Sequence, residues 1–184
     1  ELEEGEGRGP VKAATRAVGG RFTTKPVTLL RKSYSAIVAI DQQGKATALF
    51  ERTIPTGPEE EQSGPLETAT HPARGSWSKP QAVAPPESVP YALAYGPHSE
   101  LIALWGVQLP PSGPPEHEVA RAFIEASIQA AGGAWQPPVA LTPDGSYSSS
   151  ANLALAGNGQ ATAIWLHEPT RGEELIETAD YQPS

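Results

Sequence analysis

Apolar and polar residues follow one fixed order along this chain, and the order recurs four times. Each recurrence begins with a short strand of alternating apolar and polar residues. The first residues of these strands are Val11, Leu66, Ile124 and Ile176, which lie 55, 58 and 52 residues apart. A strand-rich unit repeated at a spacing of about 50 residues predicts a propeller or a related array.

The first three units continue with a turn, an aromatic residue and a second strand. The turns contain Gly19-Gly20, Arg74-Gly75 and Gly132-Gly133, and the aromatic residues that follow them are Phe22, Trp77 and Trp135. Pro26, Pro80 and Pro138 come next, followed by the short runs VTLL, QAVA and VALT. Glycine and proline commonly mark the turns between strands, so we expect two short strands joined by a turn in each unit.

A polar loop then leads into an apolar hairpin. The outgoing strands are AIVAI (36–40), YALAY (91–95) and ANLALA (151–156), and the returning strands are ATALF (46–50), LIALW (101–105) and ATAIW (161–165). Two apolar runs separated by a few turn residues predict a hairpin. Runs without alternation indicate that both faces of the strand are covered. This burial is expected for the two innermost strands of a propeller blade, which lie between neighbouring blades.

One segment favours a different structure when it is read alone. Residues 118–133 (EVARAFIEASIQAAGG) are rich in alanine, space Val119, Phe123 and Ile128 as on a helix face, and end in glycine. The equivalent segments are richer in threonine and valine, and Pro72 is incompatible with the interior of a helix. We therefore predict a strand here as well.

The strands number two in 11–30, four in 36–84, four in 91–142 and three in 151–181, thirteen in all. We therefore predict an all-β, propeller-like array of four-stranded antiparallel blades, with about three blades present. Because propellers close with at least about four blades, we expect the chain to be part of a larger propeller. Residues 1–10, acidic and glycine-rich, are expected to be a tail or linker. Residues 11–184 would hold the blades, in units that begin near 11, 66, 124 and 176.

The turn segments resemble the Asp-box of sialidase-type propellers, which has the form S-x-D-x-G-x-T-W between the third and fourth strands of a blade. Residues 15–22 (TRAVGGRF) and 70–77 (THPARGSW) fit this frame, and residues 128–135 fit it more loosely. The aromatic residue is kept in all three, but the aspartate position holds Ala17, Pro72 and Ala130, so the box is degenerate. The resemblance covers nearly all of residues 11–181 and implies bacterial sialidase-like blades, but it implies little about activity.

Composition excludes several classes of function. With 20 Pro and 18 Gly among 184 residues, a helical bundle is not expected. A net charge of −8 without a basic run argues against nucleic acid as a partner. The absence of Cys excludes disulfides and thiolate metal sites, and no apolar stretch reaches the length of a membrane span. The chain begins at Glu1 without an initiator Met or a signal peptide, so we expect a mature product or an excised piece.

Aromatic residues recur once or twice in each unit. They follow the turn (Phe22, Trp77 and Trp135) or end the returning strand (Phe50, Trp105 and Trp165). Because packing between blades needs a large side chain in every blade, we expect these residues to fill the core. The alternative is that some of them are stacking platforms for sugar rings.

The loops that join second to third strands and fourth to first strands open on the same face of a propeller, where ligands usually bind. These loops are 31–35, 85–90 and 144–150, together with 51–65, 106–117 and 166–175. The candidate ligand-binding residues on this face are Arg31, Lys32, Tyr34, Arg52, His117, Asp144, Tyr147, His167, Glu168 and Arg171. The alternative for each is ordinary solvated loop polarity.

The resemblance also implies a test for enzymatic activity. Sialidase-like enzymes clamp a substrate carboxylate with three arginines from different blades, a role that suits the planar guanidinium. The inner strands here begin at Ala36, Tyr91 and Ala151 without such an arginine, and Arg31 and Arg52 lie near but do not repeat. We therefore expect no catalytic residues in this chain.

Metal ligands are also sparse in the sequence. His117 and His167 are flanked by glutamates but lack the ligand spacing of zinc sites. We expect no cofactor. The one alternative is a weak calcium site in the loop 54–65, which carries Glu59-Glu60-Glu61, since hard oxygen ligands suit that ion.

The pattern as a whole favours a non-catalytic binding module of an exported bacterial protein, secreted or at the cell surface. Its ligand, a carbohydrate or a protein, would bind at the loop face. Its other partners would be further propeller blades, from the same parent protein or from a second chain, because open edge strands tend to associate. Two alternatives stay open: part of a sialidase-like glycoside hydrolase whose catalytic blades lie outside this chain, or a purely structural spacer.

Overall fold

The computed structural model describes residues 9–33, 35–57, 60–112, 119–143, 147–170 and 172–182. All secondary-structure elements in these ranges are β-strands, which confirms the prediction of an all-β chain. The strands are β1 (Gly9–Ala13), β2 (Val27–Ser33), β3 (Ala36–Ile40), β4 (Ala46–Pro55), β5 (Glu61–His71), β6 (Gln81–Ala84), β7 (Ser88–Tyr95), β8 (Leu101–Ser112), β9 (Val119–Gln129), β10 (Val139–Ala140), β11 (Tyr147–Leu155), β12 (Ala161–Thr170) and β13 (Glu173–Tyr181).

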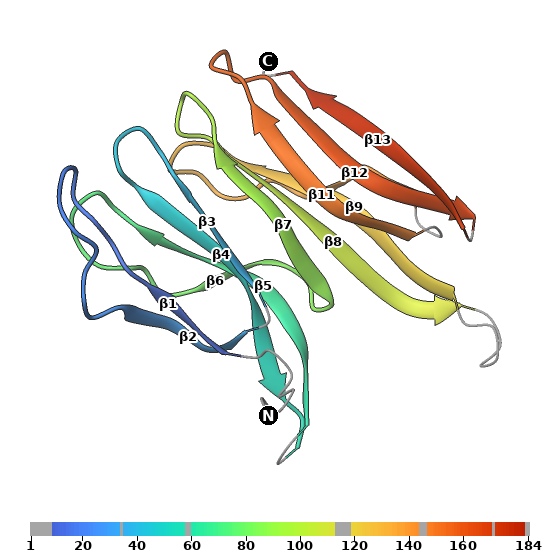
Figure 1. The fold of residues 1–184 in the computed structure, drawn as a ribbon, viewed down its shortest axis with the longest axis horizontal. Helices are drawn as coiled ribbons and strands as arrows, with labels where there is room; N and C mark the ends of the chain where they lie inside the picture. The colour runs from blue at the N-terminus through green and yellow to red at the C-terminus, as the bar shows by residue number, and fades with distance from the viewer. Residues whose placement is uncertain are drawn as a thin grey trace.

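The strands form four consecutive antiparallel meanders. The first meander is β1–β2, the second β3–β6, the third β7–β10 and the fourth β11–β13. The third and fourth are joined into one larger sheet by a single parallel residue pair, Tyr147 with Ala122. Figure 1 shows the four meanders side by side in chain order, from β1–β2 to β11–β13. The strands are thus grouped as the sequence predicts, two, four, four and three to a group.

The first strands of the second, third and fourth meanders lie next to each other. β3 contacts β7, and β7 contacts β11. Each of these strands is followed by a hairpin partner, β4, β8 or β12, and both strands of each hairpin come from the apolar runs of the sequence. The faces of neighbouring meanders therefore meet along their inner hairpins.

Apolar side chains gather in three cores, and each core lies between two neighbouring meanders. Leu30 of the first meander packs with Phe50 of the second. Leu49 and Leu66 of the second pack with Trp105 of the third. Ile124 of the third packs with Ala163, Trp165 and other residues of the fourth. Since each sheet alone leaves both faces open, burial depends on the neighbouring sheet.

Strand register shows which residues occupy equivalent places. Ile40 pairs with Ala46, Tyr95 with Leu101 and Leu155 with Ala161, so each hairpin closes at the same point. Counting from there, Leu104 of the third meander is equivalent to Ile164 of the fourth. Leu104 is 1% exposed under the cover of the next sheet, whereas Ile164 is 42% exposed. The difference arises because nothing among the described residues covers the outer face of the fourth meander.

A second pair of equivalent residues shows the same contrast. Trp105 pairs with Glu125, and Trp165 pairs with Glu177, so the preceding residues Ile124 and Ile176 are equivalent. Ile124 is fully buried, and Ile176 is 71% exposed. The outer face of the fourth meander thus presents at its surface the residues that form a core one meander earlier.

The opposite end of the array has a matching uncovered surface on β3. Val38 and Ile40 are 65% and 67% exposed. By register, Val38 is equivalent to Leu93 and Leu153, which pack into the cores shared with the preceding meander. The first meander has only two strands, and no strand among the described residues lies over Val38.

Two sequence-based expectations about local structure have clear outcomes. Residues 119–129 form strand β9, so its pairing with β8 overrides the helical propensity of the segment. Phe22, predicted to lie in the core, is instead exposed and stacks with the Arg16 guanidinium at 5.7 Å. Its equivalents Trp77 and Trp135 pack on cores shared with a preceding meander, and the first meander has no predecessor among the described residues.

Equivalent substitutions test whether stability comes from cover by the next sheet. Leu104→Ala is expected to lower the free energy of unfolding by about 2–5 kcal/mol, because it leaves a cavity in a closed core. Ile164→Ala removes an equivalent but half-exposed side chain, and is expected to cost less than about 1 kcal/mol. Urea unfolding of both variants measures the difference. Equal losses would contradict the account of the cores.

Candidate functional site at the loop end

One end of the array carries the connections between second and third strands and between successive meanders. This end, called the loop end, includes the described connecting residues 35, 56–57, 60, 85–87, 141–143 and 172. Four of the ten candidate ligand-binding residues, Tyr34, His117, Asp144 and Arg171, lie outside the described residues. The remaining six have defined positions.

These six residues lie on strands, although the sequence predicted them in loops. Arg31 and Lys32 belong to β2, Arg52 to β4, and Tyr147 to β11. His167 and Glu168 belong to β12. The strands run past their apolar cores because backbone hydrogen bonds continue the ladder whatever the side chains are, as in the pairs Thr53–Ser63 and His167–Leu175. Their polar side chains can therefore meet cross-strand partners.

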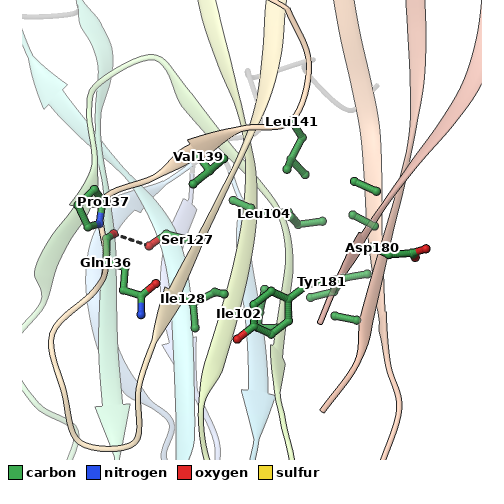
Figure 2. A pocket seen from close by; sticks show the side chains of 15 residues that line it. Ile102, Leu104, Ser127, Ile128, Gln136, Pro137, Val139, Leu141, Asp180 and Tyr181 are labelled. Carbon is green, nitrogen blue, oxygen red and sulfur yellow. Dashed lines mark hydrogen bonds between the residues drawn. The ribbon is translucent and has the colours of Figure 1, made fainter. Parts of the chain in front are cut away.

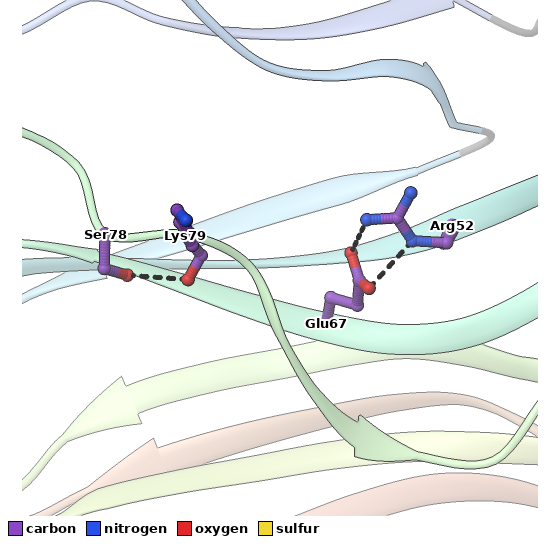
Figure 3. Close-up of polar contacts among 4 residues, drawn as sticks. All are labelled: Arg52, Glu67, Ser78 and Lys79. Atoms are coloured by element: carbon purple, nitrogen blue, oxygen red, sulfur yellow. Dashed lines mark hydrogen bonds and ion pairs between the residues drawn. The ribbon is translucent and has the colours of Figure 1, made fainter.

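Arg52 has such a partner in Glu67 on β5. Its Nε and Nη2 each donate to one carboxylate oxygen of Glu67, both at 2.7 Å (Figure 3). The Arg52 side chain is 38% exposed, and that of Glu67 is 10% exposed. The hydrogen bonds to Glu67 raise the pKa of Arg52 above its ordinary value, against the lowering effect of burial. This bidentate contact uses the two guanidinium donors that would otherwise be available to bind a ligand carboxylate.

His167 also has a partner within the fold. Its Nδ1 lies 2.9 Å from the Ser148 hydroxyl, directly across the β11–β12 ladder. A serine beside a histidine can form a nucleophile pair. Here both side chains are buried, so the contact helps hold β11 to β12 and offers a substrate no access.

Two further candidates are used in contacts of the protein's own. Lys32 forms a salt bridge with Glu61 of β5. Glu168 accepts a hydrogen bond at 2.6 Å from the backbone N–H of Gly172, which closes the turn between β12 and β13. Arg31 and Tyr147 have exposed side chains and are therefore the candidates best placed to meet a ligand.

Tyr91 lies near Tyr147 at the same end, and sequence reasoning did not select it. Burial raises the pKa of Tyr91, as does the nearby Tyr147, whereas a hydrogen bond with the backbone of Ser150 lowers it. Its ring lies against Gly106, where a Cβ would stand 2.7 Å from the ring carbon Cε2. Gly106 thus leaves the space that the ring occupies, and the neutral phenol is favoured in the folded protein.

A second feature that sequence reasoning missed is a glutamate one residue after each of three anchors, the unit-initial residues Leu66, Ile124 and Ile176. Glu125 accepts a hydrogen bond from Trp105 Nε1 at 2.9 Å, and Glu177 accepts one from Trp165 Nε1 at 3.1 Å. The equivalent Glu67 faces Phe50, which has no donor, and binds Arg52 instead. The repeated offset from the anchors was a usable signal, and it marks these glutamates as structural partners.

Buried serines repeat in the same way, three residues before each inner apolar run. Ser33, Ser88 and Ser148 are all buried. The Ser33 hydroxyl donates to the backbone oxygen of Ser35, Ser148 contacts His167, and Ser88 has no hydrogen-bond partner among the described residues. Because the three hydroxyls have different partners, no common hydrogen bond explains the repeated serine. What the three positions share is a tightly packed environment that a small side chain fits.

The described residues were compared with the requirements of a metal site and of a membrane-spanning helix. No group of three or more His, Asp or Glu side chains there is placed to hold a metal ion. Glu59, part of the proposed calcium loop, lies outside the described residues, and Glu61 belongs to β5. No helix that could cross a membrane occurs in the same residues.

Comparison with known proteins adds no relatives. No family model matches the chain, and neither a curated protein nor a solved structure is significantly similar to it.

A substitution at Arg52 tests whether its role is structural. Arg52→Met keeps most of the side-chain length but leaves the largely buried Glu67 carboxylate without two hydrogen bonds. We expect the free energy of unfolding to fall by about 1–2 kcal/mol, and Glu67→Gln in the same chain should restore part of it. Arg74→Met, at an exposed turn, should cost less than about 0.5 kcal/mol in the same denaturation experiment. Equal effects of the two substitutions would contradict the structural role.

Proposed function

We propose that this chain is a non-catalytic recognition module that forms part of a larger propeller-like array. Its meanders are the blades of that array, further blades are its partners, and a carbohydrate or protein ligand binds at the loop end. The parent protein would be an exported bacterial one, for which the absence of Cys is no obstacle.

The observation that carries the proposal is the contrast between equivalent residues in the third and fourth meanders. Ile164 and Ile176 are exposed where Leu104 and Ile124 are buried. Leu166 pairs with Ile176 and is also exposed, so the outer face presents an apolar patch across β12 and β13. An exposed patch of this kind marks a contact surface. A further blade would cover it as the fourth meander covers the third.

The uncovered β3 supports the same proposal from the other end. Val38 and Ile40 face the side on which a preceding pair of inner strands would lie. With an apolar surface at each end, the array is suited to continue in both directions. Heterologous contacts of this kind build rings or open stacks.

The contacts and the exposure of the candidate residues support recognition at the loop end. Arg52, His167 and Glu168 serve contacts within the fold, which removes them as free acids, bases or clamps. Arg31 and Tyr147 remain at the surface of that end. Arg31 lies on the first meander and Tyr147 on the fourth, so they offer two separate contacts, a fork of donors and an apolar ring, each of which suits binding of a sugar or a peptide.

Light scattering after size exclusion tests the assembly. The 19.3 kDa chain is expected to show a mass that rises with concentration, because association buries the exposed apolar residues on the outer face of the fourth meander. Ile164→Lys with Ile176→Lys should return it to a monomer, whereas Val18→Lys, at an exposed turn, should leave the association unchanged. A stable monomer at all concentrations with one cooperative thermal transition would contradict the proposal.

Binding to arrays of glycans and of peptides tests recognition at the loop end. A ligand found in this way is expected to contact one of these two separate residues, and Arg31→Ala or Tyr147→Ala should weaken its binding by at least about tenfold, a loss typical of a central contact. Arg74→Ala, at the opposite end, should have no effect. Ligand binding that Arg74→Ala weakens and the other two leave intact would place recognition elsewhere.

A further inference from the structure

A groove of about 320 Å³ opens between the third and fourth meanders, away from the loop end. Ile102, Leu104 and Ile128 line one wall, and Ala163, Ala179 and Tyr181 line the other. Figure 2 shows Val139 and Leu141 above these residues and Asp180 directed away. The volume is at the lower end of that of small-ligand sites, about 300–1,000 Å³. Its walls are mostly apolar.

Large aromatic side chains lie at the equivalent places of the other two junctions. Trp77 packs on the core between the first and second meanders, with its ring 5.4 Å from that of His71. Trp135 packs on the core between the second and third, and pairs with Gln129. Each lies eleven residues after its anchor, Leu66 or Ile124.

Strand register places Tyr181 at the position of His71 and Gln129. Ala46 pairs with His71, Leu101 with Gln129, and Ala161 with Tyr181, each at the closing end of its hairpin. An aromatic residue at the same offset from Ile176 would lie beside Tyr181, and among the described residues that line the groove Tyr181 is the only aromatic one. The groove therefore lies where the repeat has an aromatic side chain in the two earlier junctions.

The strand next to the groove also has a free edge. Among the described residues, β13 pairs only with β12. In the second meander, β6 occupies the corresponding edge by pairing with β5, and in the third, β10 pairs with β9. An open edge offers backbone donors and acceptors to an added strand.

We propose that this groove and the β13 edge together form a receptor for one extended strand of the chain's own repeat type, supplied by a further repeat. The strand pairs antiparallel with β13 and places a tryptophan in the groove beside Tyr181, with a proline three residues later as in the W-x-x-P segments of Trp77 and Trp135. This inference rests on the proposed assembly with further blades and specifies one contact of it.

The geometry favours a strand over an isolated small molecule. The groove continues directly into the unpaired edge, so an occupant that forms backbone hydrogen bonds satisfies both surfaces. The side chains of Ala163 and Ala179 leave room on the fourth meander, whereas Ile102 and Ile128 supply an apolar wall from the third. In the two earlier junctions, the chain's own Trp77 and Trp135 already make the contact that we propose for the groove.

A peptide that copies the fourth strand of the third meander, β10, and the segment before it tests the receptor. The probe is residues 131–143 (AGGAWQPPVALTP), labelled at its N-terminus and titrated into the full chain at a concentration where the chain is monomeric. Fluorescence anisotropy should show saturable one-to-one binding. The same peptide with Trp135→Ala should bind at least about tenfold more weakly, since the aromatic side chain supplies most of the apolar contact.

Two substitutions in the chain localise the binding. Ala179→Leu fills the groove and is expected to weaken binding at least about tenfold, whereas Thr178→Leu, on the opposite face of β13, is expected to leave it unchanged. Circular dichroism checks that both variants fold. If Ala179→Leu unfolds the chain, hydrogen exchange of the wild type decides: bound peptide should slow exchange of the outward-facing β13 amides.

Three results would overturn the inference: no saturable binding, equal binding of the Trp135→Ala peptide, or binding without protection of β13. Binding of N-acetyltryptophanamide as tight as that of the peptide would also contradict a strand receptor. Failure of the peptide to bind while the chain still associates would reject the groove and keep the proposed assembly. Peptide binding by a chain that stays monomeric at all concentrations would reject the assembly and keep the groove.

Discussion

Each sheet of this protein can bury its apolar side chains only where a neighbouring sheet covers them. A single antiparallel meander has two faces, and the inner hairpins here are apolar on both. The three cores accordingly lie between sheets, with Phe50, Trp105 and Trp165 as their largest buried side chains. Because the hydrophobic effect scales with the apolar area removed from water, stability depends on how many junctions are closed.

The same constraint explains both uncovered ends and the groove. Ile124 is buried because a following sheet covers it, and its equivalent Ile176 is exposed because no described residues form a sheet beyond it. At the other end, preceding strands cover Leu93, whereas no described strand covers Val38. Polar residues are placed by the same stacking, since Glu125 and Glu177 satisfy indole donors that the cores would otherwise leave unpaired. The ends are therefore the places where the chain is suited to meet partners.

Much of the fold could be predicted from the sequence, and much less of the candidate site. The runs AIVAI and YALAY fall within β3 and β7, because a short apolar run bounded by turn residues predicts a strand. The expected cover on both faces is wrong for β3, where Val38 and Ile40 are exposed. Segment 119–129 was identified as a strand only by comparison with its equivalents, since its own composition favours a helix. The pairing of Arg52 with Glu67 depends on register, which a bulge shifts between Glu51 and Thr53, and no local pattern reveals a bulge. The prediction that Phe22 lies in the core is wrong because burial at this position depends on a neighbouring sheet and not on the residue's own unit.

Native-state hydrogen exchange, resolved by residue, tests the dependence of each sheet on its neighbours most directly. We expect the slowest exchange in the central hairpins β4–β5 and β8–β9, which are covered by sheets on both sides. We expect much faster exchange in β1–β2 and β13, at the two ends of the described array, since local opening costs least where few contacts are lost. Uniform protection from β2 to β13 would contradict the account, because the end sheets would then be stable without the cover on which it depends.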